Sequence, residues 1–189
     1  MISIGIAAGG RSTRFGSDKR YAAFGGSTLL ETVLGNFRGF ADIILSVDSK
    51  ENAPQGLDEN IRITEDVEQG IGPIEAISRI LEASDNEFVF ICAGDMPFVK
   101  GDFASYLASF ITEGVACICP VSEGRVNPLC AIYSTKMLPV LEEFKARKDY
   151  RLRDVLDAVN TLYVPFPQGG FGSEVFRNIN TYEDYLSAF

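Results

Sequence analysis

The chain has 189 residues, of which 46% are hydrophobic and 23% charged, values close to the average for one globular domain with a full-sized core. We therefore expect a single domain over residues 1–189. The formal net charge of −9 would repel a polyphosphate backbone, and no run of Lys or Arg offsets it, so we expect no nucleic-acid partner. Any anionic ligand must be held by local groups.

Histidine does not occur anywhere in the chain. Its absence excludes Ser-His-Asp, Cys-His and His-ligated metal chemistry. Catalysis must then rest on carboxylates, Lys, Arg, backbone amides and an oxygen-coordinated metal.

The cysteines indicate structural thiols. Cys92, Cys117, Cys119 and Cys130 lie in apolar runs and lack the spacing of a zinc site, so we expect them to be buried and free. The chain passes from Met1 into a short apolar run without a signal-length segment, and no run approaches the roughly 20 residues of a membrane helix. We expect a cytoplasmic protein without a membrane partner.

Short apolar runs alternate with segments of helical period along the whole chain. In order, we expect strand 2–6, helix 29–37, strands 43–47 and 61–63, helix 74–81, strand 88–92, helix 103–110, strands 115–119 and 129–133, helices 137–144 and 152–159, and strand 162–164. A final helix begins at Thr181, which has the spacing of a capping box with Asp184. This alternation predicts an α/β sandwich with a mostly parallel sheet, in which ligands bind beyond the carboxyl ends of the strands.

One segment has the composition of a loop. Residues 168–173 contain three glycines with little apolar anchoring. The segment is either a mobile loop or an inert surface loop.

The segment after the first strand, AAGGRSTRFGSDK at residues 7–19, is suited to binding an anion. Its small residues let backbone amides approach phosphate closely, and Arg14 and Lys19 add positive charge at a reach suited to a triphosphate. The segment is neither a Walker A loop nor a GxGxxG fingerprint. The alternative is a tight turn with solvated charges.

Acidic residues follow two later strands. Asp95 lies at the end of strand 88–92, between Gly94 and Pro97, where it could coordinate a Mg²⁺ ion that bridges phosphate oxygens. Glu65 and Asp66 follow strand 61–63. The alternatives are a turn-forming Asp in the first case and a solvated acidic pair in the second.

Together and in this order, these segments resemble the MobA family, the molybdenum cofactor guanylyltransferases. The segment at residues 7–19 resembles the family motif LAGGxxxRMGxxDK. The segments TED and GIGPIEAI resemble the family's ED and GPLxGI, and CAGDMPF resembles its CDxPF. Arg125, Asn127 and Pro128 resemble its RxHP, and residues 178–181 its N-x-N-T. The resemblance implies a Rossmann-like three-layer sandwich of the nucleotide-diphospho-sugar transferase type.

The resemblance also implies roles for individual residues. The expected GTP-binding residues are Ala7, Ala8, Gly9 and Lys19, with Asp66 contacting the nucleotide and Asp95 binding both nucleotide and Mg²⁺. Further motif positions with less defined roles are Gly10, Arg14, Asn178 and Asn180. The sequence departs from the family at Ala7, which replaces Leu, at Glu75 and Ala76, which replace a small residue and Gly, and at Asn127, which replaces His. We associate the departures at 75–76 and 127 with the acceptor side of the site.

The reaction that the resemblance implies joins GTP to the molybdopterin-bound molybdenum cofactor and releases pyrophosphate. The attacking phosphate has a second pKa near 6 and is mostly dianionic at pH 7, so a chain without histidine needs no general base. Mg²⁺ on Asp95, Lys19 and Arg14 would neutralise the charge that builds on the α-phosphoryl group and on pyrophosphate. Proteins that deliver the cofactor, or that mature molybdoenzymes, are the transient partners that this reaction implies.

Three other functions remain open. Cytidylyl transfer to the same cofactor is disfavoured because Gly9 lies where cytidylyl relatives carry Ala, and a Gly there leaves room for a purine. Transfer to a sugar phosphate is disfavoured by Asp18, where many such relatives have Pro. A non-catalytic nucleotide-binding protein is disfavoured because Lys19, Asp66 and Asp95 are all retained.

Overall fold

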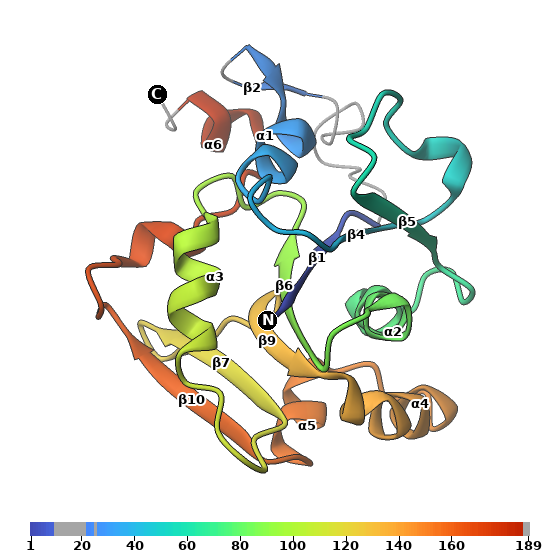
Figure 1. The fold of residues 1–189 in the computed structure, drawn as a ribbon, viewed down its shortest axis with the longest axis vertical. Helices are drawn as coiled ribbons and strands as arrows, with labels where there is room; N and C mark the ends of the chain where they lie inside the picture. The colour runs from blue at the N-terminus through green and yellow to red at the C-terminus, as the bar shows by residue number, and fades with distance from the viewer. Residues whose placement is uncertain (10–21, 25, 187–189) are drawn as a thin grey trace.

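The computed structural model describes residues 1–9, 22–24 and 26–186 (Figure 1). Its strands are β1 (Ser3–Ala7), β2 (Ala23–Phe24), β3 (Ser27–Thr28), β4 (Ile43–Val47), β5 (Ile61–Glu65), β6 (Phe88–Ala93), β7 (Cys117–Ser122), β8 (Arg125–Val126), β9 (Cys130–Ser134) and β10 (Thr161–Phe166). Its α-helices are α1 (Leu29–Gly35), α2 (Pro73–Ala83), α3 (Gly101–Ala108), α4 (Leu138–Ala146), α5 (Leu152–Asp157) and α6 (Tyr182–Leu186). Short 3₁₀ helices cover Lys50–Asn52, Thr135–Met137 and Ser173–Phe176.

The main sheet has the strand order β10-β7-β9-β6-β1-β4-β5, with β8 paired to β7. Strands β6, β1, β4 and β5 run parallel to one another, as do β10 and β7, whereas β9 is antiparallel to both of its neighbours. The mostly parallel sheet predicted from the sequence is therefore confirmed. After β1 the sheet continues through β4 on one side, whereas after β6 it continues through β7 on the other side. In α/β sheets such a reversal of strand order leaves a crevice between the carboxyl ends of the two neighbouring strands, here β1 and β6.

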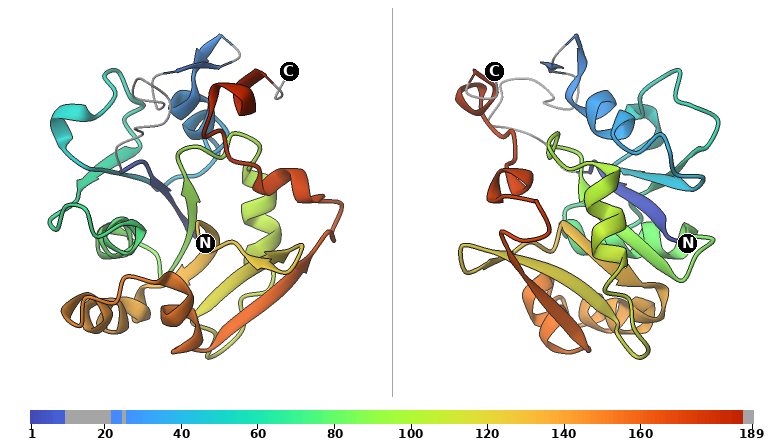
Figure 2. Two further views of the ribbon diagram at one scale, coloured as in Figure 1. Left: turned by 180° about the vertical axis from the view of Figure 1, so that it is seen from behind. Right: turned by 60° about the vertical axis from the view of Figure 1, so that its left-hand side comes forward.

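Helices cover the sheet on both faces, which confirms the predicted three-layer sandwich. Along β6, Phe90 and Cys92 pack into one core with residues of α1 and α3, while Val89 and Ile91 pack into a second core with residues of α2, α4 and α5. This alternation follows from the two-residue period of a strand. Figures 1 and 2 show α3 on the opposite side of the sheet from α2 and α4.

A glycine in the central strand lets α2 approach the sheet closely. A Cβ atom on Gly5 would lie 2.4 Å from Cγ2 of Ile80 and 2.8 Å from Cδ1 of Ile91. Both distances are too short for any larger side chain. The glycine therefore fixes how near α2 lies to β1, and α2 begins at the site described below.

The cysteines are buried and free, as predicted. Burial raises the pKa of the Cys119 thiol to about 12, so this thiol is an inert part of the core. In the part of the chain that the structure describes, no helix combines the length and the apolar character needed to cross a membrane.

The glycine-rich segment at residues 168–173 is anchored by an aromatic side chain, which the sequence analysis did not expect. The Phe171 ring packs edge-on against Phe103, with ring centroids 5.1 Å apart, and Gln168 pairs with Phe171 in an isolated β-bridge. Gly169 has a φ of +63° and lies against the ring of Tyr106. The expectation of little apolar anchoring was therefore wrong, because the glycines form the turn that brings Phe171 onto the core.

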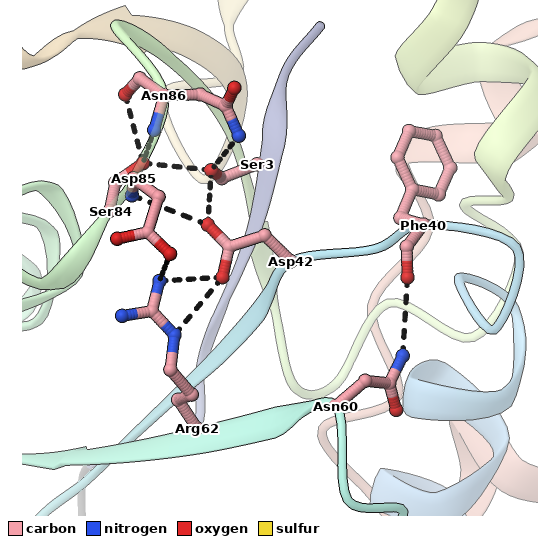
Figure 3. Close-up of polar contacts among 8 residues, drawn as sticks. All are labelled: Ser3, Phe40, Asp42, Asn60, Arg62, Ser84, Asp85 and Asn86. Atoms are coloured by element: carbon pink, nitrogen blue, oxygen red, sulfur yellow. Dashed lines mark hydrogen bonds and ion pairs between the residues drawn. The ribbon is translucent and has the colours of Figure 1, made fainter.

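A polar network closes the edge of the sheet where β1, β4, β5 and β6 begin (Figure 3). The Arg62 guanidinium donates to the Asp42 carboxylate, with Nη2 and Oδ1 2.6 Å apart, and Ser3 donates its hydroxyl to the other oxygen of Asp42. Ser84 and the Asn86 side chain both donate to the Ser3 hydroxyl. Burial opposes ionisation of Asp42, but these hydrogen bonds outweigh it and hold its pKa below the ordinary value.

Candidate active site

A cavity of about 640 Å³ lies at the carboxyl edge of the sheet, beyond the ends of β1, β4 and β5 and beside the start of α2. Cavities of this size commonly hold small ligands. Its lining residues are Ala7, Gly9, Asp48, Asp66, Gln69, Gly70, Gly72, Pro73, Ala76 and Leu129. The fold thus brings together Ala7, Gly9 and Asp66, which the sequence analysis placed in the nucleotide site.

Asp66 presents its carboxylate to this cavity from the end of β5. Its backbone N–H donates to Val47 O at 3.0 Å, and its Oδ1 accepts a hydrogen bond from the buried Ser46 hydroxyl at 3.2 Å. Burial raises the pKa of Asp66, the Ser46 hydrogen bond opposes this, and the negative charges of Glu75 and Asp48 raise the pKa further. A partly desolvated acid among other acids favours a ligand that donates hydrogen bonds.

Gly9 lies directly against Asp66. A Cβ atom on Gly9 would lie 3.0 Å from Asp66 Oδ2, and the φ of Gly9 is not in the left-handed region. Close approach, and not backbone conformation, is therefore what requires a glycine here. Any larger residue would press on the Asp66 carboxylate.

Asp95 lies at the end of β6, next to the end of β1. Gly94 donates its N–H to Ala7 O at 2.9 Å, and a Cβ atom on Gly94 would lie 3.2 Å from the Cβ of Ala8. This contact holds the two strand ends together, so that Asp95 follows at the crevice where the strand order reverses.

The segment at residues 178–181, which resembles the N-x-N-T motif, contacts Asp95. The Asn178 side chain donates from Nδ2 to Asp95 Oδ1 at 3.3 Å, and the Ile179 N–H donates to Asp95 O at 2.9 Å. Two segments that the sequence analysis singled out separately therefore meet at one point.

The remaining predicted residues divide into two groups. Ala8 is buried, and its N–H donates to Ser46 O at 2.9 Å. The Asn180 residue is exposed, and its N–H donates to Asp184 Oδ2 at 2.9 Å at the start of α6, where Thr181 and Asp184 form the predicted capping box. The other three predicted positions, Gly10, Arg14 and Lys19, lie outside the described residues.

The donor groups at this edge fit a metal that arrives with its substrate. Within residues 1–9, 22–24 and 26–186, no three acidic, cysteine or histidine side chains are grouped closely enough to hold a metal ion by themselves. Mg²⁺ is commonly bound by one or two carboxylates together with substrate phosphates and water. Asp95 can supply one such carboxylate.

The residues that depart from the family motif do not share one location. Ala76 lines the cavity beside Gly9 and Asp66, and Glu75 is fully buried. The association of both with the acceptor side stays a prediction. Asn127 donates from its backbone to Pro120 O at 2.9 Å and from its side chain to Arg125 O at 3.2 Å, which stabilises the turn between β8 and β9.

Two polar residues of the cavity, Asp48 and Gln69, were not predicted from the sequence. Asp48 directly follows the buried strand β4, and the rule that singled out Asp66 and Asp95 at strand ends would have found it too. Gln69 has no comparable signal, because it lies in an exposed connection whose path depends on α2.

Comparisons with known proteins agree with this geometry. Residues 4–162 match the model of the MobA-like NTP transferase domain. A probable molybdenum cofactor guanylyltransferase of Methanosarcina acetivorans is 36% identical over 96% of this chain and 87% of that protein, and one of Bacillus subtilis is 30% identical over 95% and 90%. The crystal structure of molybdopterin-guanine dinucleotide biosynthesis protein A from Archaeoglobus fulgidus has the same fold, with a TM-score of 0.85 and 23% identity over 99% of this chain and 96% of that one. The chain is therefore a nucleotidyltransferase that belongs to the MobA-like NTP transferase family.

Proposed function

We propose that the chain transfers GMP from GTP to the molybdopterin-bound molybdenum cofactor, forming the guanine dinucleotide cofactor and releasing pyrophosphate. The observation that carries this proposal is the cavity at the carboxyl edge, which has Asp66 on its wall and Asp95 across the end of β1. The choice of acceptor and of guanine as the base follows from the names of the relatives, and the cavity is where we propose that the nucleoside binds.

In this proposal the nucleoside occupies the cavity. The guanine base carries adjacent N–H donors at N1 and at the 2-amino group, and the ribose carries hydroxyl donors. A carboxylate accepts hydrogen bonds from such groups, and a charge-assisted bond is roughly twice as strong as a neutral one. Asp66 and Asp48, which line the same cavity, match a ligand of this kind. Cytosine has one donor on this edge, its 4-amino group, beside the acceptors N3 and O2, so it lacks the adjacent pair of donors that guanine offers to carboxylates.

The triphosphate extends beyond the end of β1, toward Asp95. An oxygen of the acceptor's terminal phosphate forms a bond to the α-phosphorus of GTP, the bond from that phosphorus to the bridging oxygen breaks, and pyrophosphate leaves with the electron pair. Because the nucleophile is already dianionic, no residue has to remove a proton. Mg²⁺, when bound, supplies neutralisation of charge on the phosphates.

The chain's own residues align the reacting groups. The backbone after β1, together with Arg14 and Lys19, would hold the phosphates, and Asp95 would hold the metal that accompanies them. Asn178 orients Asp95 through the contact at its Oδ1. Proteins that donate the cofactor or receive the product are proposed as transient partners, and the chemistry requires neither nucleic acid nor a membrane.

The experiment is a nucleotide panel. The purified full-length chain is incubated with Mg²⁺, the molybdopterin-bound molybdenum cofactor and GTP, CTP, ATP or UTP, and pyrophosphate release is measured. We expect release with GTP, and only when the acceptor is present. A preference for CTP would replace guanylyl by cytidylyl transfer, and tight GTP binding without any release would support a binding protein.

A further inference from the structure

A buried ion pair lies behind the nucleotide cavity, between α2 and α4. Glu75, in the first turn of α2, has a side chain that is 0% exposed, and Lys145, near the end of α4, is 5% exposed. Glu75 Oε2 and Lys145 Nζ are 2.7 Å apart, and Lys145 also donates to Glu142 Oε1 at 3.0 Å. Burial opposes both charges, but hydrogen bonding within the pair lowers the pKa of Glu75 and raises that of Lys145, so both are charged at neutral pH.

The second oxygen of Glu75 holds the wall of the cavity. Oε1 accepts hydrogen bonds from the Val67 N–H at 2.9 Å and from the Glu68 N–H at 3.3 Å. These two amides directly follow Asp66 in the chain. One carboxylate therefore fixes the backbone next to the acid that faces the cavity. Its charge is balanced by Lys145 at Oε2 and by Arg79, whose Nε lies 3.5 Å from Oε1.

Apolar packing does not hold this part of the wall. Residues 67–70 are all exposed, and the Val67 side chain is 72% exposed. The Asp66 N–H donates to Val47 O at 3.0 Å, and the Ser46 hydroxyl donates to Asp66 Oδ1 at 3.2 Å. Farther along the segment, Lys145 Nζ lies 4.0 Å from Glu68 Oε1, and the Gln69 side chain donates to Asp48 O at 3.4 Å. The bonds to Glu75 thus fix the backbone at residues 67 and 68, between Asp66 and Ile71, the residue that packs against the second core just before α2.

A requirement for stability does not by itself explain the pair. Replacing a buried ion pair with apolar residues of similar volume is often neutral or stabilising, because desolvation of both charges is avoided. Apolar residues, however, cannot accept hydrogen bonds from the Val67 and Glu68 amides. What the pair supplies uniquely is an acceptor of fixed position.

We propose that Glu75 is a positioning residue that fixes residues 66–72 as one wall of the nucleoside cavity, with Lys145 as its counter-charge. The inference rests on the proposed function, since it takes the cavity to hold the nucleoside of GTP. If the hydrogen bonds from the Val67 and Glu68 amides to Glu75 are lost, residues 66–72 populate other conformations. The apparent affinity for GTP then falls in proportion to the fraction of molecules that keep the binding-competent conformation.

Two charge-neutral double variants separate positioning from stability. Glu75→Gln/Lys145→Met keeps a carbonyl oxygen that can accept from both amides, whereas Glu75→Met/Lys145→Met removes every acceptor and leaves an apolar contact. We expect both to remain folded and to melt at similar temperatures, because each removes the same two charges and leaves Arg79 paired with Glu82. The Kd for GTP with Mg²⁺ should stay within about threefold of wild type in the Gln variant and rise about tenfold or more in the Met variant.

Inorganic triphosphate and a distant variant serve as controls. Triphosphate lacks the nucleoside, so its Kd should be equal in the two doubles. Asp42→Asn, in the network at the other edge of the sheet, should lower the melting temperature without changing the Kd for GTP. Equal Kd values for GTP in the two doubles would overturn the positioning role while leaving the proposed function intact, and a wild-type protein that binds no GTP would overturn both.

Amide hydrogen exchange in the wild-type protein provides a second test that needs no variant. The Val67 and Glu68 amides belong to exposed residues, so only a fixed acceptor slows their exchange. We expect protection at both positions, above that of Gln69 and Gly70. Exchange at the rate of an unprotected amide would overturn the proposal.

Discussion

The two edges of the central sheet use the same kind of side chain in opposite ways. At the edge where the strands begin, Asp42 is held by Arg62 and Ser3, and its pKa is lowered. At the carboxyl edge, Asp66 lies beside Asp48 and Glu75, and its pKa is raised. The first edge directs its polar groups at one another and stabilises the fold, whereas the second leaves carboxylates facing a cavity. The proposed nucleotide site thus lies where the fold tolerates the cost of a partly buried carboxylate near other acids.

The largest effect that separates the two edges is expected for Asp95→Asn. The change removes the charge of the proposed metal ligand without altering side-chain volume, so turnover should fall by at least about a hundredfold while the melting temperature stays near that of wild type. Turnover at saturating GTP and Mg²⁺, together with thermal melts, provides the check. Near wild-type turnover would make Asp95 a turn residue only.

Lys19→Ala tests the charge on the segment after β1. Loss of a charge-assisted hydrogen bond to phosphate should weaken GTP binding and slow transfer by roughly 1.5 to 3 kcal/mol, and Arg14→Ala should act in the same direction. The Kd for GTP measures the loss of binding, and the single-turnover rate measures the slower transfer. Unchanged values for Lys19→Ala would indicate a solvated lysine in a simple turn.

Gly9→Ala tests the contact between the end of β1 and Asp66. The new methyl group would lie 3.0 Å from Asp66 Oδ2, and overpacking of a fitted site commonly costs about 1 to 3 kcal/mol. Because the φ of Gly9 is not in the left-handed region, we expect a shift of the carboxylate and not a distorted turn. The ratio of kcat/KM for GTP to that for CTP should fall, and a uniform loss for both nucleotides would argue against this cause.

Asp42→Asn should lower stability and leave turnover unchanged, which is the reverse of what we expect for Asp95→Asn. Arg62 is 42% exposed and water screens the pair, so we expect a loss of about 1 kcal/mol of stability and no change in turnover. The folded-state pKa of Asp42 is lowered, so its contribution is present above the unfolded value near 3.9 and is lost as pH falls below it. Melts at pH 7 and pH 3 should show the difference from wild type shrinking at the lower pH.

Asp66→Asn should change stability by less than Asp42→Asn does, and in the opposite direction. The folded-state pKa of Asp66 is raised, so the ionised acid opposes folding above that pKa, and the penalty disappears as pH falls below the unfolded value. The variant should therefore gain about 0.5 to 1 kcal/mol at pH 7, with the gain lost at pH 3, while GTP binding weakens. A variant less stable than wild type at pH 7 would contradict the account.

The sequence predicted helices and strands well where the element was long enough to show a periodic pattern of hydrophobic residues. The run at 43–47 became β4 without change of bounds, and the face formed by Ile74, Ile77 and Ile80 became α2. The two-residue strands β2, β3 and β8 were missed, because a strand of that length carries no period. The antiparallel direction of β9 was also not predictable, since direction depends on which strands become neighbours.

The candidate site could be predicted as far as its residues follow a strand. Asp66 and Asp95 were found by their positions after strands, and the same rule would have included Asp48. Lys145 could not be found, since a lysine near the end of an amphipathic helix normally faces solvent. Its partner Glu75 became significant only when the fold placed α4 against α2.

The division between the two edges can be tested directly by hydrogen exchange of the full-length protein with and without GTP and Mg²⁺. The account predicts slower exchange at residues 7–9, 66–72 and 94–96 when nucleotide is bound, and unchanged exchange at Ser3, Asp42, Arg62 and residues 84–86. Protection confined to the edge where the strands begin, or no protection at residues 66–72 under conditions where GTP binds, would contradict it.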